Sequence, residues 1–330
     1  MKTLKDTRRI GLGCMNLSHA YGPRPTESEA IALLNGALDL GYDHLDTAAL
    51  YGFGNNESLL GKAVMHRRDD FCLASKCGMF KDETGKKSVD GRPSVIKRTC
   101  EDALRRLNTD VIDLYYLHRW DKRIPIEESI GAMADLVQQG KVLQLGLSEV
   151  SADTLRKAHR EHPITALQTE YSLWSRNAEI ASLRACEELD ISFVAFSPLA
   201  RGYLSAELNN LSHLPDNDIR HNMPRFSAEN YPHNLVLLEP VKAMAADLGI
   251  TPAQLTLAWL LHQTPTMVAI PGTTSLDHAR ANLAATEIKL TETQLDTLDH
   301  AINLDTVSGA RYGKATLAEI DTELFDSEKV

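Results

Sequence analysis

Short apolar runs recur along the 330-residue chain, and each is followed by a loop and then by a stretch with helical periodicity. Many of the runs are apolar at both odd and even positions, which is typical of parallel strands buried on both faces. The runs predict eight strands, at Ile10–Cys14, Tyr42–Asp46, Phe71–Lys76, Val111–His118, Leu143–Ser148, Ala166–Glu170, Ser192–Phe196 and Met267–Pro271.

Helical signals occupy the intervals between these runs. Thr26 and Glu29 form a capping box that opens a helix, and its apolar stripe ends before Gly41. A second clear stripe spans residues 126–137 and stops at Gly140. We expect further helices at about 58–65, 94–107, 152–161, 178–189, 235–248, 252–263, 276–285 and 291–303.

Eight strand–helix units in one chain of this length favour a closed (β/α)8 barrel, a TIM barrel, formed as a single domain over residues 1–330. An open doubly wound sheet would require a dinucleotide fingerprint after the first strand, and Gly11-Leu-Gly13 lacks its third glycine. Two long stretches, 77–93 and 200–234, follow strands and are expected to be loops at the carboxyl-terminal face.

Composition narrows the range of partners. The formal net charge of −10 and the pI of about 5.6 disfavour nucleic acid and anionic membranes. No window approaches the ~20 apolar residues that span a bilayer, and the charged start MKTLKDTRR reaches no apolar core of a signal peptide.

Five scattered cysteines without a C-x-x-C pair fit a reducing cytoplasm. The dispersed histidines show no metal-binding spacing, so no metal is expected.

Ionisable residues stand at the carboxyl ends of three consecutive predicted strands. These residues are Asp46, Lys76 and His118, and Tyr51 follows Asp46 by five positions in the loop ALYGFG. Since catalytic groups converge at this end of a barrel, the four side chains are expected to meet there. Each has a structural explanation when taken alone, and the set is what indicates chemistry.

These four residue types together form a proton-transfer device. A tyrosine has an ordinary pKa of about 10, and we expect the ammonium of Lys76 to lower the pKa of Tyr51. Asp46 would pair with Lys76 and keep it charged in a buried site. His118, expected to be neutral, would hydrogen-bond and orient a substrate oxygen. The prediction is an acid, Tyr51, directed at a carbonyl.

The same residues carry a family resemblance. The motifs Asp46-Thr-Ala-Ala-Leu-Tyr51-Gly, Ser75-Lys76 and Tyr116-Leu-His118-Arg resemble the aldo-keto reductase superfamily in order and spacing. The match continues through GLSE (146–149), LQTEYSLWSR (167–176), FSPLARGYL (196–204) and IPGTT (270–274) to Asn282. A loop with DIR (218–220) and PRF (224–226) is similar to that of a bacterial and plant group within the superfamily.

The resemblance implies a (β/α)8 barrel that binds NADPH across its mouth and passes hydride to an aldehyde or ketone, with Tyr51 as general acid. Asp46, Lys76 and His118 match the rest of a catalytic tetrad. By the same resemblance, Ser148 and Gln168 would hold the carboxamide and Phe196 would stack on the nicotinamide. The remaining positions match the cofactor site: Met15, Asp46, Ser197, Leu199, Arg201 and Gly202 toward the nicotinamide and pyrophosphate, and Thr273, Thr274, Arg280 and Asn282 at the adenosine end.

Two positions depart from the family pattern. Glu149 stands where many relatives have Asn, so an amide contact cannot be carried over there. Ser275 stands where a Lys or Arg often meets the 2′-phosphate, which leaves Arg280 and His278 as the cationic candidates. The 2′-phosphate of NADPH needs cations and amides at a helix N-terminus, and the helix that begins near Ser275 can supply the amides. NADPH is therefore expected as the cofactor, and NADH is less favoured.

Several questions stay open at this level. The resemblance also takes in potassium-channel β subunits, so a cofactor-binding regulatory subunit is one alternative. A barrel aldolase with Lys76 as a Schiff base is another, although Asp46 would keep that lysine protonated. Six loop aromatics and methionines are candidates for an apolar substrate pocket: Tyr21, Phe53, Met79, Phe80, Trp120 and Trp174. The carbonyl substrate, the direction of reaction and the oligomeric state are not determined by these residues.

Overall fold

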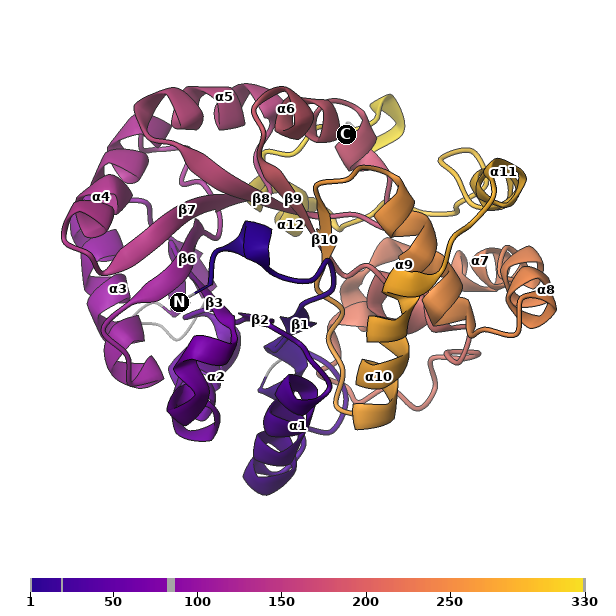
Figure 1. The fold of residues 1–330 in the computed structure, drawn as a ribbon. Helices are drawn as coiled ribbons and strands as arrows, with labels where there is room; N and C mark the ends of the chain where they lie inside the picture. Colours follow the sequence, from indigo (N-terminus) through magenta and orange to yellow (C-terminus); the bar gives the residue numbers. More distant parts are fainter. Residues whose placement is uncertain (1, 19, 82–86, 329–330) are drawn as a thin grey trace.

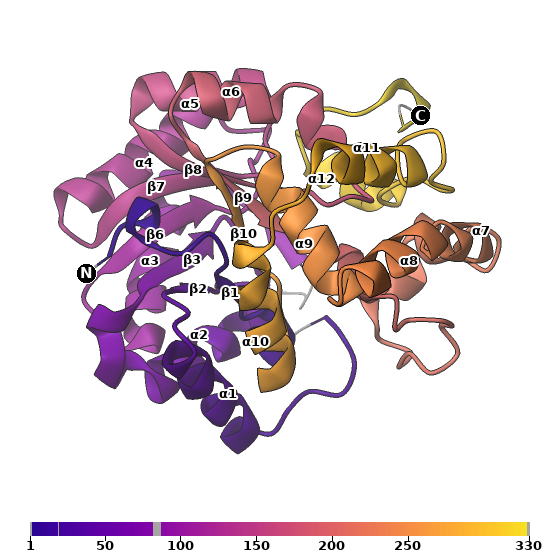
Figure 2. The same ribbon diagram turned by 45° about the vertical axis from the view of Figure 1, so that its right-hand side comes forward.

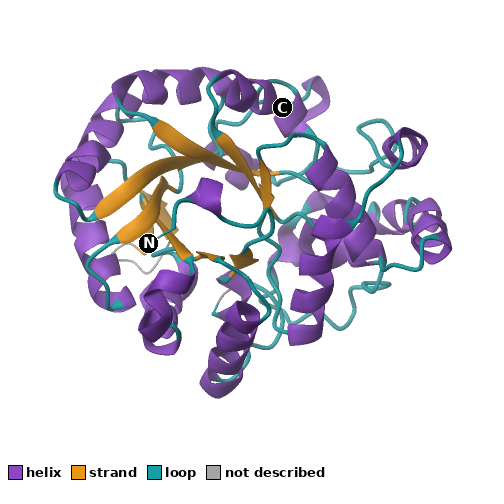
Figure 3. Cartoon of the chain, viewed as in Figure 1, coloured by secondary structure: helices purple, strands orange, loops and turns teal. Residues whose placement is uncertain are grey.

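The computed structural model describes residues 2–18, 20–81 and 87–328. Its strands form a ring surrounded by helices, as expected for a (β/α)8 barrel (Figure 1, Figure 3). The strands of the ring are β1 (Leu12–Gly13), β2 (His44–Asp46), β3 (Cys72–Cys77), β6 (Ile112–Leu117), β7 (Val142–Ser148), β8 (Ile164–Glu170), β9 (Ser192–Phe196) and β10 (Met267–Ala269).

The eight strands of this sheet pair in the order β1-β2-β3-β6-β7-β8-β9-β10, and the neighbours in this order are parallel. A parallel bridge between Ile10 and Ala269 closes the ring, and the amide of Gly11 donates to the carbonyl of Ala269 at 2.9 Å. All eight predicted strands are confirmed, and the fold class with them.

Helices surround the ring (Figure 1); most of them lie in the chain between successive strands, and the last three follow β10. They are α1 (Glu27–Asp39), α2 (Asn55–Ala63), α3 (Pro93–Leu107), α4 (Ile126–Gln138), α5 (Ala152–Glu161), α6 (Ser182–Glu188), α7 (Tyr231–Val236), α8 (Glu239–Asp247), α9 (Pro252–His262), α10 (Leu276–Ala284), α11 (Glu292–Ala301) and α12 (Lys314–Glu319). The capping box of Thr26 and Glu29 opens α1 as predicted. No helix in the described ranges is long and apolar enough to cross a bilayer.

Two expectations about the elements need correction, and one helix was not expected. The 77–93 stretch is not only a loop, because β4 (Met79–Lys81) pairs antiparallel with β5 (Lys87–Val89) within it. The predicted helix 235–248 is divided into α7 and α8, and Pro240 in the first turn of α8 suits a fresh helix start. Helix α12 was not predicted. In Figure 2, α7 and α8 project away from the barrel beside α9.

Two apolar layers hold the barrel together. The larger lies between the ring and its helices. A smaller cluster fills the inside of the ring with Ala74, Leu114, Tyr116, Ala166 and neighbouring residues, and Leu4 from the short N-terminal turn Leu4–Asp6 joins it. That turn lies in front of the centre of the ring in Figure 1 and covers this end of the interior. The opposite, carboxyl-terminal end carries the candidate site.

Candidate active site

Neighbouring strands bring three predicted residues to one end of the ring. Asp46 is the last residue of β2, Lys76 the penultimate residue of β3, and His118 directly follows β6. These strands are adjacent, with Asp46 beside Ala74 and Lys76 beside Tyr116 in the parallel register. The spacing read from the sequence is therefore realised in space, because parallel strands direct their carboxyl ends to the same side.

Lys76 is completely buried and is surrounded by oxygen atoms. Its Nζ atom lies 2.5 Å from Oδ1 of Asp46, 2.8 Å from the carbonyl oxygen of Thr47 and 3.2 Å from the hydroxyl of Tyr51. The other carboxylate oxygen of Asp46 accepts a 2.8 Å hydrogen bond from Nε2 of Gln168 on β8. The ammonium and the carboxylate thus have full sets of partners, as buried charges require.

Tyr51 reaches this cluster from the loop after β2. The amides of Thr47 and Ala49 continue the pairing with β3 by donating to the carbonyls of Ala74 and Lys76. Gly52 and Gly54 then take positive φ angles of 57° and 93°, which turn the chain sharply into α2. The ring of Tyr51 is 8% exposed and meets the His118 ring edge-on, with centroids 5.8 Å apart.

Supporting polar contacts around this loop were not predicted. Asn56 at the start of α2 donates to the carbonyl of Cys14 and the hydroxyl of Ser18, both at 2.9 Å, and accepts from Thr47. The carboxylate of Glu57 accepts from Ser75 and pairs with Arg106 at 2.7 Å. Asn56 and Glu57 follow Tyr51 closely in the motif G-x-G-N-N-E. This closeness was the sign in the sequence that they could support the Tyr51 loop.

Burial sets the direction of the pKa of Tyr51. Its pKa is raised above the usual value because desolvation of the phenolate outweighs the opposing charge of Lys76. The predicted net lowering is therefore wrong, although Lys76 does act in the expected direction. Desolvation also acts to lower the pKa of Lys76, but Asp46 and Tyr51 outweigh it and the pKa is raised. Lys76 is thus held as the ammonium.

A cavity of about 640 Å³ opens beside this cluster. Asp46 and Tyr51 form part of its wall. The other predicted residues that line it are Met15, Phe196, Ser197, Leu199, Arg201, Gly202, Thr273 and Asn282. The strand ends of β1, β2, β9 and β10, which are neighbours in the closed ring, and the loops that follow them therefore contribute to one pocket.

The remaining predicted residues, including Lys76 and His118, lie outside this lining. Ser148 and Gln168 are buried at the ends of β7 and β8. Thr274 is exposed. Arg280 is also absent from the cavity lining; its side chain is 63% exposed and pairs with Asp277 at 3.3 Å. The adenosine-end role expected for Arg280 is not supported by this placement.

The cationic side chains of the cavity wall differ in how far ion pairs within the protein already occupy them. The guanidinium of Arg201 pairs with Glu170 at 2.6 Å, and Arg220 pairs with Asp218 at 2.8 Å. Lys242 on α8 also lines the cavity, together with His278, and its described ion pair is to the exposed Glu239. Nothing in the sequence distinguishes Lys242, because only the packing of α8 brings it to the pocket.

Of the six candidates for the substrate pocket, only Tyr21 is in the cavity lining, which does not include Phe53, Met79, Phe80, Trp120 or Trp174. Tyr21 lines the cavity and accepts a 2.7 Å hydrogen bond from Arg201. Trp174 does not line it, because this ring is buried and stacks on Tyr203 with centroids 4.0 Å apart. Among the described residues, no group of three or more His, Cys, Asp or Glu side chains is placed to hold a metal ion.

Comparisons with known proteins agree on one family. The sequence model of the Aldo/keto reductase family matches residues 9–303. The glycerol dehydrogenase AKR11B4 from Gluconobacter oxydans is 25% identical, with a TM-score of 0.83 over 97% of this chain and 94% of its own. The aldo-keto reductase AKR11C1 from Bacillus halodurans is 29% identical, with a TM-score of 0.74 over 93% of this chain and 95% of its own.

A third similar structure contains a nucleotide. It is the aldo/keto reductase from Klebsiella pneumoniae in complex with NADP and acetate, 28% identical, with a TM-score of 0.72 over 93% of this chain and 95% of its own. The family match spans the strand-end residues, the loop of Tyr51 and most of the cavity wall. The chain belongs to the aldo/keto reductase family.

Proposed function

We propose that the protein is an oxidoreductase that reduces aldehydes or ketones to alcohols, with NADPH as the hydride donor. The observation that carries this proposal is the hydroxyl of Tyr51, which stands at the cavity wall with the Lys76 ammonium 3.2 Å behind it. A proton donor beside a fixed cation suits a reaction in which negative charge develops on a carbonyl oxygen.

Each residue of the cluster has a role in this proposal. Tyr51 donates its hydroxyl proton to the substrate oxygen, and Lys76 stabilises the phenolate that remains. Asp46 holds Lys76 charged and in place, and Gln168 in turn fixes the carboxylate of Asp46. His118, edge-on to Tyr51, orients the substrate oxygen toward the hydroxyl.

The cavity residues suit a dinucleotide. The half-buried ring of Phe196 offers a face for a flat heterocycle, and residues of the 197–202 turn line the pocket beside it. Thr273 and Asn282 would hold the adenosine end. Lys242, His278 and the N-terminal amides of α10 are the groups that could meet a phosphate there. One N–H of Gln168 Nε2 donates to Asp46, so a contact with a carboxamide would use its Oε1 atom or its second N–H.

The aldolase alternative loses support from the same geometry. A Schiff-base lysine needs a depressed pKa, whereas Asp46 and Tyr51 keep the pKa of Lys76 raised. The regulatory-subunit alternative has no specific observation in its favour. We further propose that residues 1–330 act as one domain in the cytoplasm, where its five buried, unpaired cysteines would remain reduced.

The test compares the Tyr51→Phe protein with the wild type. We expect NADPH binding, followed by protein fluorescence, to be retained, and turnover of a panel of carbonyl substrates to fall by about 10²–10⁴-fold. Tyr171→Phe is the matched control. The hydroxyl of Tyr171 donates to Glu179 at 2.7 Å, and Tyr171 does not line the cavity. Undiminished turnover in the Tyr51→Phe protein would refute the assignment of the acid.

A further inference from the structure

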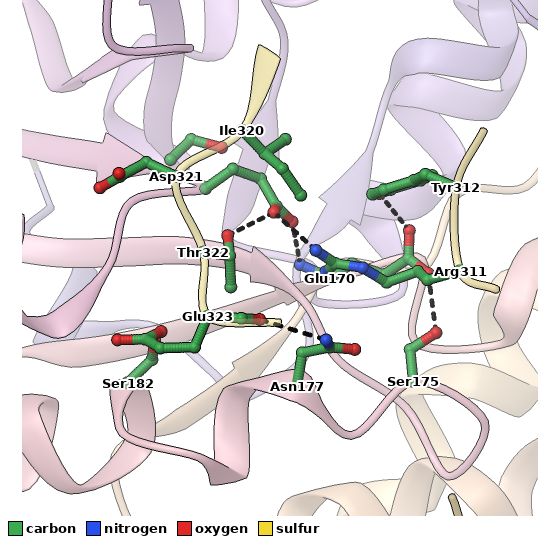
Figure 4. A network of polar contacts seen from close by, with 12 residues as sticks. Glu170, Ser175, Asn177, Ser182, Arg311, Tyr312, Ile320, Asp321, Thr322 and Glu323 are labelled. Carbon is green, nitrogen blue, oxygen red and sulfur yellow. Dashed lines mark hydrogen bonds and ion pairs between the residues drawn. The ribbon is translucent and has the colours of Figure 1, made fainter. Parts of the chain in front are cut away.

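The chain beyond residue 303, where the family model ends, returns to the carboxyl ends of β7 and β8. We call residues 309–328 the C-terminal segment; Figure 4 shows its polar contacts with the strand ends. The amide of Asp321 donates to the carbonyl of Glu149 at 2.9 Å, and the Asp321 carboxylate accepts from the amide and hydroxyl of Ser151. The segment is therefore bonded directly to the chain that leaves β7.

Glu149 is the centre of these contacts. It follows Ser148, the last residue of β7, and adopts a positive φ of 54°, which is uncommon for a residue with a side chain. Its carboxylate accepts from the amide of Glu170 at 2.8 Å and from the hydroxyl of Thr322 at 2.5 Å. Glu149 thus joins the ends of β7 and β8 to the C-terminal segment.

The charge of Glu149 requires a cation, because its side chain is fully buried. Arg311, also fully buried, supplies this cation at 3.4 Å (Figure 4). In this chain the acidic residue and the C-terminal arginine therefore form a matched pair.

The same segment also reaches the cavity wall. The hydroxyl of Tyr312 donates to the carboxylate of Glu170 at the end of β8. That carboxylate also accepts from Arg201, whose guanidinium donates to the hydroxyl of Tyr21. Arg201 and Tyr21 both line the cavity. Contacts from the C-terminal segment thus extend to the pocket through Glu170.

We infer that Glu149 and Arg311 are positioning residues for the nicotinamide end of the cofactor site. They fix the ends of β7 and β8, where Ser148 and Gln168 stand, the two residues proposed to hold the carboxamide. This inference rests on the proposed function. Thr273 and Asn282 of the proposed adenosine end lie on the loop after β10 and on α10, outside these contacts.

Replacing Arg311 should weaken binding of the nicotinamide end of the cofactor and leave binding of the adenosine end unchanged. In the Arg311→Met protein, the buried carboxylate of Glu149 would lack its cation, so the strand ends would shift toward water. We expect the Kd of NADP+ to rise about tenfold, equivalent to roughly one lost hydrogen bond. The Kd of 2′,5′-ADP, which has no nicotinamide, should change by less than about twofold.

The binding experiment uses isothermal titration of both nucleotides with the full-length protein. The Glu149→Gln/Arg311→Met protein should regain tight NADP+ binding, because Gln keeps the acceptor for the Glu170 amide and needs no cation. Arg68→Met is the matched control. It removes the partner of the buried Asp113 at 2.7 Å, at the opposite end of the barrel, and should leave both Kd values unchanged.

A milder variant keeps the test informative if Arg311→Met does not fold. Thr322→Val removes one donor to Glu149 and should weaken NADP+ about threefold while sparing 2′,5′-ADP. Unchanged NADP+ binding in these variants, or an equal loss for both nucleotides, would overturn the inference. Failure of the wild-type protein to bind NADP+ would instead refute the proposed function.

Discussion

The Lys76→Met substitution is expected to change both the free energy of unfolding and the rate of catalysis. The substitution removes the ammonium that pairs with Asp46 at 2.5 Å and donates to Thr47 and Tyr51. Asp46 is only 1% exposed, so its carboxylate would remain buried and would keep the hydrogen bond from Gln168 without its cation. Met has a similar length, so the change is chiefly electrostatic.

The structure sets the size of the effect on folding. Removing one partner of a buried ion pair costs about 3–5 kcal/mol, against a total stability of about 5–15 kcal/mol for an ordinary domain. Lys87→Met is the control, because its pair with Glu319 at 2.6 Å is surface-exposed and is worth about 0–1 kcal/mol. Urea denaturation of both variants measures the difference in the free energy of unfolding.

The effect on chemistry has a defined sign. In the proposed mechanism, the reverse reaction, alcohol oxidation, would use the phenolate of Tyr51 as its base. Burial already raises the pKa of Tyr51 and Lys76 opposes this rise, so removing Lys76 should raise the pKa further. The rise of oxidation rate with pH should therefore move to higher pH, and kcat at neutral pH should fall by about 10²–10⁴-fold.

The assay is nicotinamide absorbance across a range of pH in both directions, with stability followed in parallel. A second variant, Asp46→Asn/Lys76→Met, should recover stability without recovering turnover, because it removes the buried charge but not the need for the cation. An unshifted pH profile in the Lys76→Met protein, or a loss of stability no larger than that of Lys87→Met, would refute the reasoning.

Three further predictions follow from the cavity wall, the barrel interior and the thiols. Lys242→Met should raise the Kd of NADPH about tenfold and leave that of NADH unchanged, whereas Arg280→Met should affect neither; equal losses for both nucleotides would place Lys242 elsewhere. Gly146→Ala should cost about 1–3 kcal/mol by denaturation, because its Cβ would lie 2.4 Å from the Tyr116 ring. All five cysteines should resist alkylation in the native protein, since they are buried and burial raises the pKa of each thiol; rapid labelling of Cys77 would contradict this.

Local pattern determined much of this protein. Apolar runs that alternate with helical stripes require a parallel sheet covered on both faces, and eight such units close into a ring. Strand direction then placed Asp46, Lys76 and His118 at one end. These features depend on periodicity and chain direction, which the sequence carries by itself.

Other features depended on tertiary packing. The net direction of the pKa of Tyr51 follows from how completely the folded chain excludes water, and no local pattern gives this. Lys242 reaches the cavity and Arg280 does not, because the positions of α8 and α10 decide which cation faces the pocket. Glu149 and Arg311 meet across 162 positions of sequence, and such a long-range pair forms only when the barrel has closed.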